Sequence, residues 1–246
     1  MLLDSAVFNA ALNPVDGLIQ VAKLGLAGRN FLKNASYSAH FSVEGVSTAE
    51  AKVKIAAVRA IARRYGAEVA NSIPTYFNAE PFMDLLPILG PNGERWKPTH
   101  GIIPFSNLLQ HHQDFEKLLQ EYRDRMAVAK VQLTRMLMFF STNGFIYEPT
   151  FLWEDSRSIY HEKVYPAGLL PNVKVHPDNP EGRALVKEIK QRIADLCLKN
   201  GACHMQIGKD YPYLETRKPE MAALVRNLKQ MLDPAGLMNP GALGLD

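Results

Sequence analysis

Apolar and polar positions near the start of the chain predict a strand followed by a helix. In Ser36–Val43 apolar residues occupy every second position, which is typical of a half-buried strand. Thr48 can cap a helix, and from there to Tyr65 the apolar residues recur with the i, i+3/i+4 spacing of one helix face. The preceding residues, 1–34, show no comparable pattern and form a lead-in segment.

A long loop and a second helix follow. Asn71–Lys97 is interrupted by prolines and glycines, and the prolines of Trp96–Pro104 favour an extended backbone. Ser106 can cap the next helix. Its expected apolar face consists of Leu108, His112, Phe115, Leu119, Tyr122 and Met126.

A hairpin and a third helix complete the central pattern. Lys130–Phe140 and Phe145–Trp153 flank an Asn-Gly pair, which supplies the positive φ that tight hairpin turns need. Glu181–Lys199 has the apolar spacing of a helix, and Asn200-Gly201 can end it as a left-handed cap. Together these elements predict an α+β fold, an antiparallel sheet covered on one face by helices.

Composition narrows the class of protein. The 246 residues are 47% hydrophobic and 22% charged, which suits a globular chain with a substantial core. The net charge of +3 is spread over segments of mixed sign, so we expect no nucleic-acid partner. The apolar runs fall short of the ~20 residues of a membrane span, and the start of the chain lacks the pattern of a secretory signal. We therefore expect a cytoplasmic protein without a membrane span.

The cysteines and histidines do not predict a metal site. Cys197 and Cys203 lack the spacing of a zinc motif, and two cysteines fit a reducing or an indifferent compartment. His111 and His112 lie in the middle of a predicted helix, where hydrogen-bonded helix-face residues are the expected role.

The C-terminal residues contain the most specific pattern. Pro219–Leu232 predicts a helix with one buried apolar face. Two successive stops follow it, Asp-Pro with Gly236 and then Asn-Pro-Gly ending at Gly241. The chain is therefore expected to take a fixed irregular path after this helix.

This tail, D-P-x-G-x-x-N-P-G after a helix, resembles the C-terminal signature of FAD-linked oxidases of the vanillyl-alcohol oxidase, p-cresol methylhydroxylase and glycolate oxidase type. Trp96–Ser106, with His100 and Gly101 between two prolines, looks like the cap-domain stretch that crosses the sheet near the substrate cavity. The similarity runs in order over roughly residues 36–245.

The resemblance implies a ferredoxin-like antiparallel sheet as in the cap domain of these flavoenzymes, with FAD as cofactor. It places the cap or substrate domain at residues 35–217 and a C-terminal helix and tail at 218–246, packing toward an FAD-binding domain. No Gly-rich phosphate-binding motif occurs in the sequence. We therefore expect the FAD-binding domain to be supplied by a longer reading frame or by a separate subunit, and a homodimer is possible.

The resemblance also suggests residues near the flavin. Tyr160 and His161 align with the position where some members bond the flavin covalently, although a Tyr-His pair exposed at a strand end is the simpler interpretation. Asn239 and Gly241 are expected beside the isoalloxazine or at the interface with the FAD domain.

Ala202–Gly208 aligns with the substrate side of the flavin, where phenol-oxidising members have a Tyr-Arg pair. Here Met205 and Gln206 take those places and offer no positive charge to stabilise a phenolate. Strand alternation would direct His204 and Gln206 to one face, which makes His204 a candidate general base and His100 the next candidate. A hydrogen-bonded structural role for His204 is equally consistent with the sequence.

Two functions of different classes follow from these features. The first is the substrate domain of an FAD-dependent oxidase or dehydrogenase that oxidises an alcohol, a hydroxy acid or a 4-alkylphenol-type small molecule by hydride transfer to flavin. The alternative is a non-catalytic ferredoxin-like module that binds a ligand or a partner.

Overall fold

The computed structural model describes residues 35–68, 90, 92–140, 142–165, 168, 170–206 and 208–245. It contains two compact units, Met1–Asp84 and Leu85–Asp246. The predicted lead-in segment and most of the predicted loop at 71–97 lie outside the described residues.

The described part of the first unit contains one helix, α3 (Thr48–Ala62). Ser47 caps it by accepting a hydrogen bond from the backbone N–H of Glu50, so the predicted cap, Thr48, is instead the first helical residue. The predicted strand at 36–43 is wrong. Residues 36–43 are described and form no strand, because an alternating pattern by itself does not make a ladder.

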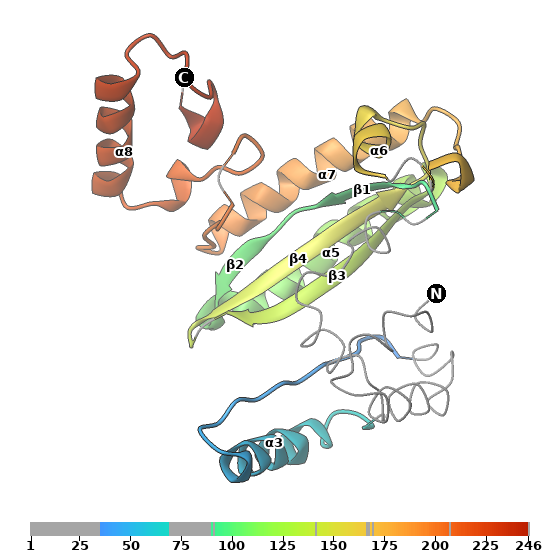
Figure 1. Ribbon diagram of the computed structural model, residues 1–246, viewed down its shortest axis with the longest axis vertical. Helices are drawn as coiled ribbons and strands as arrows, with labels where there is room; N and C mark the ends of the chain where they lie inside the picture. Colours follow the sequence, from blue (N-terminus) through green and yellow to red (C-terminus); the bar gives the residue numbers. More distant parts are fainter. Residues whose placement is uncertain are drawn as a thin grey trace. The chain divides into compact units, whose positions relative to one another are not determined.

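The second unit is built on an antiparallel sheet (Figure 1). Its strands are β1 (Arg95–Pro98), β2 (Gly101–Pro104), β3 (Val131–Phe140) and β4 (Gly144–Trp153). β4 is central: β3 pairs along its whole length on one side, and β1 and β2 share its other side. The predicted hairpin of β3 and β4 is confirmed.

The described helices of this unit are α5 (Leu108–Val128), α6 (Ile159–Val164), α7 (Pro180–Lys199) and α8 (Pro219–Leu232). Short 3-10 turns occupy Phe105–Asn107, Leu170–Asn172, Leu214–Thr216 and Ala242–Gly244. Asn179 caps α7, and Gly201, with φ 68°, ends it as predicted. No described helix has the length and hydropathy needed to cross a bilayer.

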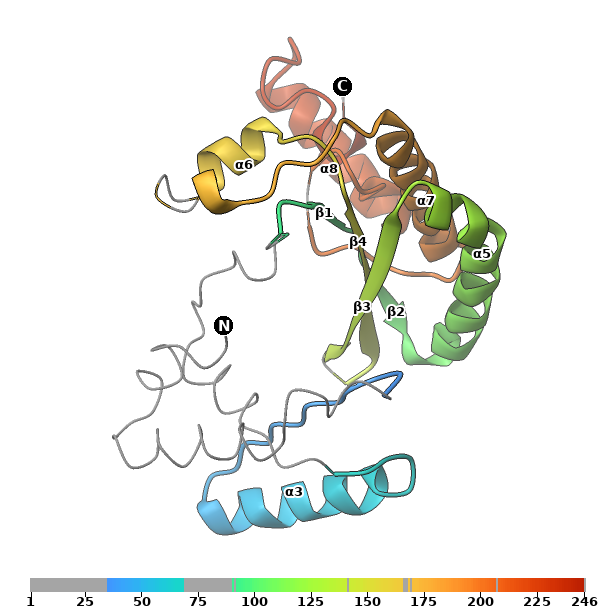
Figure 2. The same cartoon turned by 90° about the vertical axis from the view of Figure 1, so that its right-hand side faces the viewer.

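The core lies between the sheet and two long helices, α5 and α7, which cover the same face of the sheet (Figure 2). Its main members are Ile103, Phe115, Leu118, Tyr122, Tyr147, Phe151, Trp153, Leu185, Val186, Ile189 and Ile193. The α+β class and the antiparallel sheet are confirmed. The finer, ferredoxin-like topology stays a prediction.

The register of α5 differs from the predicted one. A 3-10 turn precedes the helix, so Ser106 does not cap it, and the N-cap residue is Asn107 without a side-chain cap bond. The buried positions are His111, Phe115, Leu118 and Tyr122. His111 therefore faces the core, and half-buried His112 instead bonds the hydroxyl of Tyr147 at 2.8 Å.

The C-terminal helix and its two stops form as predicted, but the apolar face of α8 is exposed. Ala222 is the buried residue of α8 within the described structure. Exposed fractions on this face reach 68% at Met231 and 73% at Leu232. The prediction of a buried apolar face is therefore wrong for the chain by itself, because no described residues cover it.

Candidate active site

Three buried aromatic rings, those of His100, His204 and Tyr211, lie together beside the sheet. His100 occupies the break between β1 and β2 and is 1% exposed. Residue 204 reaches it because Cys203 forms an antiparallel bridge with Ile102, with N–O distances of 2.8 and 3.1 Å.

Close packing at Gly101 permits this approach. A Cβ atom at Gly101 would lie 2.7 Å from Sγ of Cys197 and 3.3 Å from Cβ of Ala202. Both atoms belong to the segment that ends α7 and leads into residue 203. A glycine at this position therefore allows the segment carrying His204 to pack against β2.

Hydrogen bonds fix the three rings relative to one another. His100 Nδ1 lies 2.9 Å from Oη of Tyr211, and His204 Nδ1 lies 2.8 Å from the carbonyl oxygen of His100. The Tyr211 ring centroid is 4.6 Å from that of His100 and 4.8 Å from that of His204. Neither histidine ring can rotate without breaking these contacts.

The partners define which nitrogen carries each proton. A carbonyl oxygen only accepts, so neutral His204 is protonated on Nδ1 and has its lone pair on Nε2. That Nε2 is buried and has no hydrogen-bond partner among the described residues. The backbone N–H of Met205 donates to His100 Nε2 at 3.4 Å, so His100 carries its proton on Nδ1 and donates it to Tyr211.

Burial keeps all three rings neutral near pH 7. It lowers the pKa of His100 to about 4, and the neighbouring His204 adds to this shift. Burial also lowers the pKa of His204, and it raises the pKa of Tyr211 to about 12. The site therefore presents a neutral imidazole whose buried Nε2 has no partner in the part of the chain that the structure describes, and a neutral imidazole is the form of histidine that accepts a proton.

Charged side chains surround the rings. Asp210 pairs with Lys97 at 2.5 Å and with Lys190 at 2.9 Å. Lys190 Nζ also lies 5.6 Å from the centroid of the Tyr211 ring. Arg217 donates to the carbonyl oxygen of His204 at 2.9 Å, which holds the segment after the bridge in place.

A further carboxyl group, Glu148, lies in β4 on the face opposite the core. Its side chain is half-buried, and burial raises its pKa above the ordinary value. Its negative charge contributes to the raised pKa of Tyr211. The patterns in the sequence did not single out Tyr211 or Glu148. Tyr211 is far from His100 in the chain, and Glu148 does not belong to a recognisable sequence motif.

Two of the three predicted catalytic residues, His100 and His204, are brought together by the structure. Gln206 is exposed whereas His204 is 2% exposed, so the two do not share a face. The expected strand alternation is wrong because the segment forms a single bridge at Cys203 and then bends at Met205.

His161 and Tyr160 lie elsewhere. β4 ends at Trp153, and both residues belong to α6 rather than to a strand end. His161 is 1% exposed, its Nδ1 lies 3.1 Å from the Ser158 hydroxyl, and its Nε2 lies 3.3 Å from the carbonyl oxygen of Glu94. With both ring nitrogens engaged, His161 has no nitrogen available for a bond to flavin in this structure.

The tail folds back toward the segment that carries His204. The backbone N–H of Leu243 donates to the carbonyl oxygen of Gly208 at 2.8 Å. Asn239 and Gly241 both have left-handed backbones, with φ of 47° and 76°. The predicted cofactor-side residues of the tail are thus connected, through residue 208, to the chain that follows His204.

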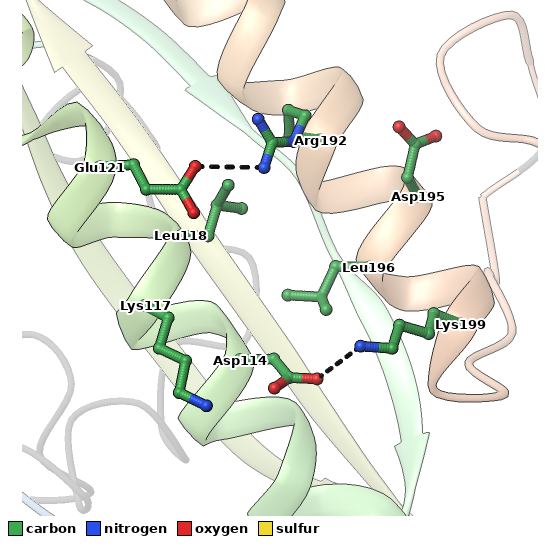
Figure 3. A pocket seen from close by; sticks show the side chains of 8 residues that line it. All are labelled: Asp114, Lys117, Leu118, Glu121, Arg192, Asp195, Leu196 and Lys199. Carbon is green, nitrogen blue, oxygen red and sulfur yellow. Dashed lines mark hydrogen bonds and ion pairs between the residues drawn. The ribbon is translucent and has the colours of Figure 1, made fainter.

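A separate groove of about 300 Å³ lies between α5 and α7 (Figure 3). Its walls hold Asp114, Lys117, Leu118, Glu121, Arg192, Asp195, Leu196 and Lys199. The charges are mixed, and four of them form two ion pairs across the groove, Lys199 with Asp114 and Arg192 with Glu121, both at 3.2 Å. These are the features of a solvated helix–helix surface.

Comparison with known families decides the identity. The family described as FAD linked oxidases, C-terminal domain, matches residues 101–243, more than half of the chain. The chain belongs to this family. No curated protein and no solved structure matches it.

An FAD-linked oxidase C-terminal domain works in the context of a flavoenzyme, so the described residues must be compared with that cofactor. The buried Nε2 of His204, which has no partner among the described residues, could accept a hydrogen bond from a hydroxyl group. The phosphates of FAD find no Gly-rich cradle in this sequence. The described residues therefore offer a hydrogen-bond acceptor to such a group, and the sequence contains no Gly-rich phosphate-binding motif.

Proposed function

We propose that this chain is the substrate domain of an FAD-dependent oxidase or dehydrogenase that oxidises an alcohol, a hydroxy acid or a 4-alkylphenol-type molecule. The observation that carries the proposal is the buried Nε2 of His204, which has no partner within the described structure, in a chain of the FAD-linked oxidase family. FAD, when bound, supplies the acceptor of a hydride from the substrate carbon.

In this proposal His204 accepts the proton of the substrate hydroxyl. Its Nδ1–H donates to the carbonyl oxygen of His100, which directs the lone pair of Nε2 toward the substrate. His100 holds the segment after His204 by accepting a hydrogen bond from the backbone N–H of Met205. The segment departs from phenol-oxidising relatives in having no Tyr-Arg pair, which favours substrates whose reacting group is an alcohol hydroxyl.

We further propose that the FAD-binding domain or subunit packs against the exposed apolar face of α8 and the tail. Leu224, Leu228 and Met231 on α8 are 50%, 41% and 68% exposed, and Leu237 in the tail is 81% exposed. Apolar surface of this kind is typical of an interaction site.

The order of the elements also supports a ferredoxin-like cap topology. A strand, α5, the β3–β4 hairpin and α7 follow one another, and the bridge at Cys203 comes after α7.

The proposal predicts that the isolated chain purifies without colour and loses added FAD during gel filtration. A dinucleotide without its phosphate contacts loses much of the interaction that holds it. The measurement is the ratio of flavin absorbance to protein absorbance in the eluted peak. A yellow peak with one FAD per chain would contradict the proposal that a separate FAD-binding domain is needed to hold the cofactor.

The tail provides a second test. Gly241→Val should lower the thermal midpoint of the chain, because φ of 76° is strained for a β-branched residue. A Cβ there would lie 3.8 Å from Cε of Lys209, an ordinary contact, so the strain comes from the backbone and not from crowding. In the enzyme reconstituted with its FAD-binding domain, we also expect lower flavin occupancy.

Gly66→Val is the matched control, because a Cβ at Gly66 meets no neighbouring atom. It should leave occupancy unchanged. If Gly241→Val changes neither flavin occupancy nor the thermal midpoint relative to this control, the tail does not belong to the flavin site.

A further inference from the structure

We propose that Tyr211 is a positioning residue for His204: its hydroxyl fixes the ring of His100, and His100 in turn fixes the tautomer and orientation of His204. The proposal rests on the proposed function, because it concerns the same histidine. It adds a residue that neither the family match nor the sequence patterns single out.

The contacts form a continuous chain from Tyr211 to His204. His100 Nδ1–H donates to Tyr211 Oη at 2.9 Å, which leaves His100 Nε2 to accept from the N–H of Met205 at 3.4 Å. The same residue, His100, accepts from His204 Nδ1–H through its carbonyl oxygen at 2.8 Å. His100 therefore holds residues 204 and 205 at two points, one through its side chain and one through its backbone.

Burial makes this arrangement depend on the tyrosine hydroxyl. Tyr211 is 8% exposed and His100 is 1% exposed, so water is a poor substitute for the hydroxyl as partner of His100 Nδ1. Without that partner the proton of His100 can move to Nε2, where it opposes the N–H of Met205. The bend after His204 would then lose its contact with the His100 side chain, and the backbone carbonyl of His100 alone would hold the ring of His204.

The surroundings hold Tyr211 itself in place. Lys190 Nζ lies 5.6 Å from the centroid of the Tyr211 ring and 2.9 Å from Asp210. Lys97, which lies in β1, pairs with the same carboxylate of Asp210 at 2.5 Å. Asp210, the neighbour of Tyr211 in the chain, is thus paired with a lysine of β1 and a lysine of α7.

The test is ¹⁵N NMR of the histidine rings in the 246-residue chain, with Tyr211→Phe as the variant. Phenylalanine keeps the ring that packs on both histidines and removes the hydroxyl alone. In the parent, we expect at least about a tenfold excess of the His204 tautomer protonated on Nδ1, as a buried hydrogen bond to a carbonyl requires. In Tyr211→Phe we expect this excess to fall to about threefold or less.

Tyr122→Phe is the matched control. Tyr122 is also buried, and its hydroxyl donates to Glu188 at 3.0 Å, between α5 and α7. This variant should lose a comparable hydrogen bond and leave the tautomer of His204 unchanged. A merely structural tyrosine at 211 would behave in the same way.

The proposal is overturned if Tyr211→Phe leaves the tautomer ratio of His204 as in the parent, or if the parent ring is protonated on Nε2. These outcomes are distinct from failure of the proposed function, which is measured by flavin reduction in His204→Ala. A changed tautomer in Tyr211→Phe together with full activity of His204→Ala would retain the positioning and reject the role of His204 as base.

Discussion

His204→Ala is expected to lower the rate of flavin reduction by about 10²–10⁴-fold in the enzyme reconstituted from this chain and its FAD-binding domain. The variant removes the buried Nε2 that has no partner among the described residues and that we propose as the proton acceptor. Flavin should remain bound, because the histidine has no part in holding the phosphates. Rapid mixing of oxidised enzyme with substrate under anaerobic conditions gives the rate.

The pH dependence has a definite direction. Burial lowers the pKa of His204, so the imidazole is neutral at pH 7 and takes up its proton at a lower pH than an ordinary histidine. The rate in the parent should therefore be constant at neutral pH and fall toward acid pH, as the base becomes protonated.

Gln206→Ala serves as the comparison, since an exposed amide offers hydrogen bonds but takes no proton. It should change the limiting rate much less than His204→Ala, because Gln206 is exposed and does not share a face with His204. Reduction at the parental rate in His204→Ala would make this histidine structural, and His100 would be the next candidate for the base.

Asp155→Ala is expected to lower the free energy of unfolding by about 3 kcal/mol. The carboxylate is fully buried and accepts hydrogen bonds from the backbone N–H groups of Ser156 and Asn179 at 2.7 and 2.8 Å. It also accepts from the indole N–H of Trp153 at 3.2 Å and from Arg183 at 2.7 Å. Removing it leaves several buried donors without a partner at the start of α7.

Urea unfolding followed by circular dichroism measures this change. Asp178→Ala is the control, because Asp178 also pairs with Arg183 but its side chain is 63% exposed. A charge pair that is this exposed contributes little to stability. Equal shifts of the unfolding midpoint in the two variants would contradict the importance of the buried network.

Local signals in the sequence predict much of the second unit. The Asn-Gly turn and the apolar runs beside it define the hairpin of β3 and β4, and Gly201 marks the end of α7. These features succeed because each depends on backbone preferences within a few residues.

The features that the sequence does not predict depend on contacts between segments that are distant in the chain. The segment at 36–43 alternates like a strand, but alternation alone does not supply a pairing partner. The apolar face of α8 has the spacing of a buried face and is nevertheless exposed in this chain. A periodic pattern identifies a face to be covered, and it does not say which chain covers it.

In the candidate site, too, local signals could be predicted and contacts between distant residues could not. His100 and His204 could be predicted as candidates because they lie in segments that resemble the family's substrate side. Tyr211 could not, because its contact with His100 spans 111 positions in the sequence. The pairing of His204 with Gln206 failed because a single bridge at Cys203 does not impose strand alternation on the residues after it.

The most direct measurement is anaerobic reduction of bound flavin, followed by its visible absorbance, in the FAD-binding domain with and without this chain. The substrates are an alcohol, a 2-hydroxy acid and a 4-alkylphenol. The account predicts that the flavin bleaches with at least one of them only when this chain is present, and that His204→Ala slows the bleaching. Equal bleaching of the FAD-binding domain without the chain would contradict the conclusion that the chain forms the substrate side of the enzyme.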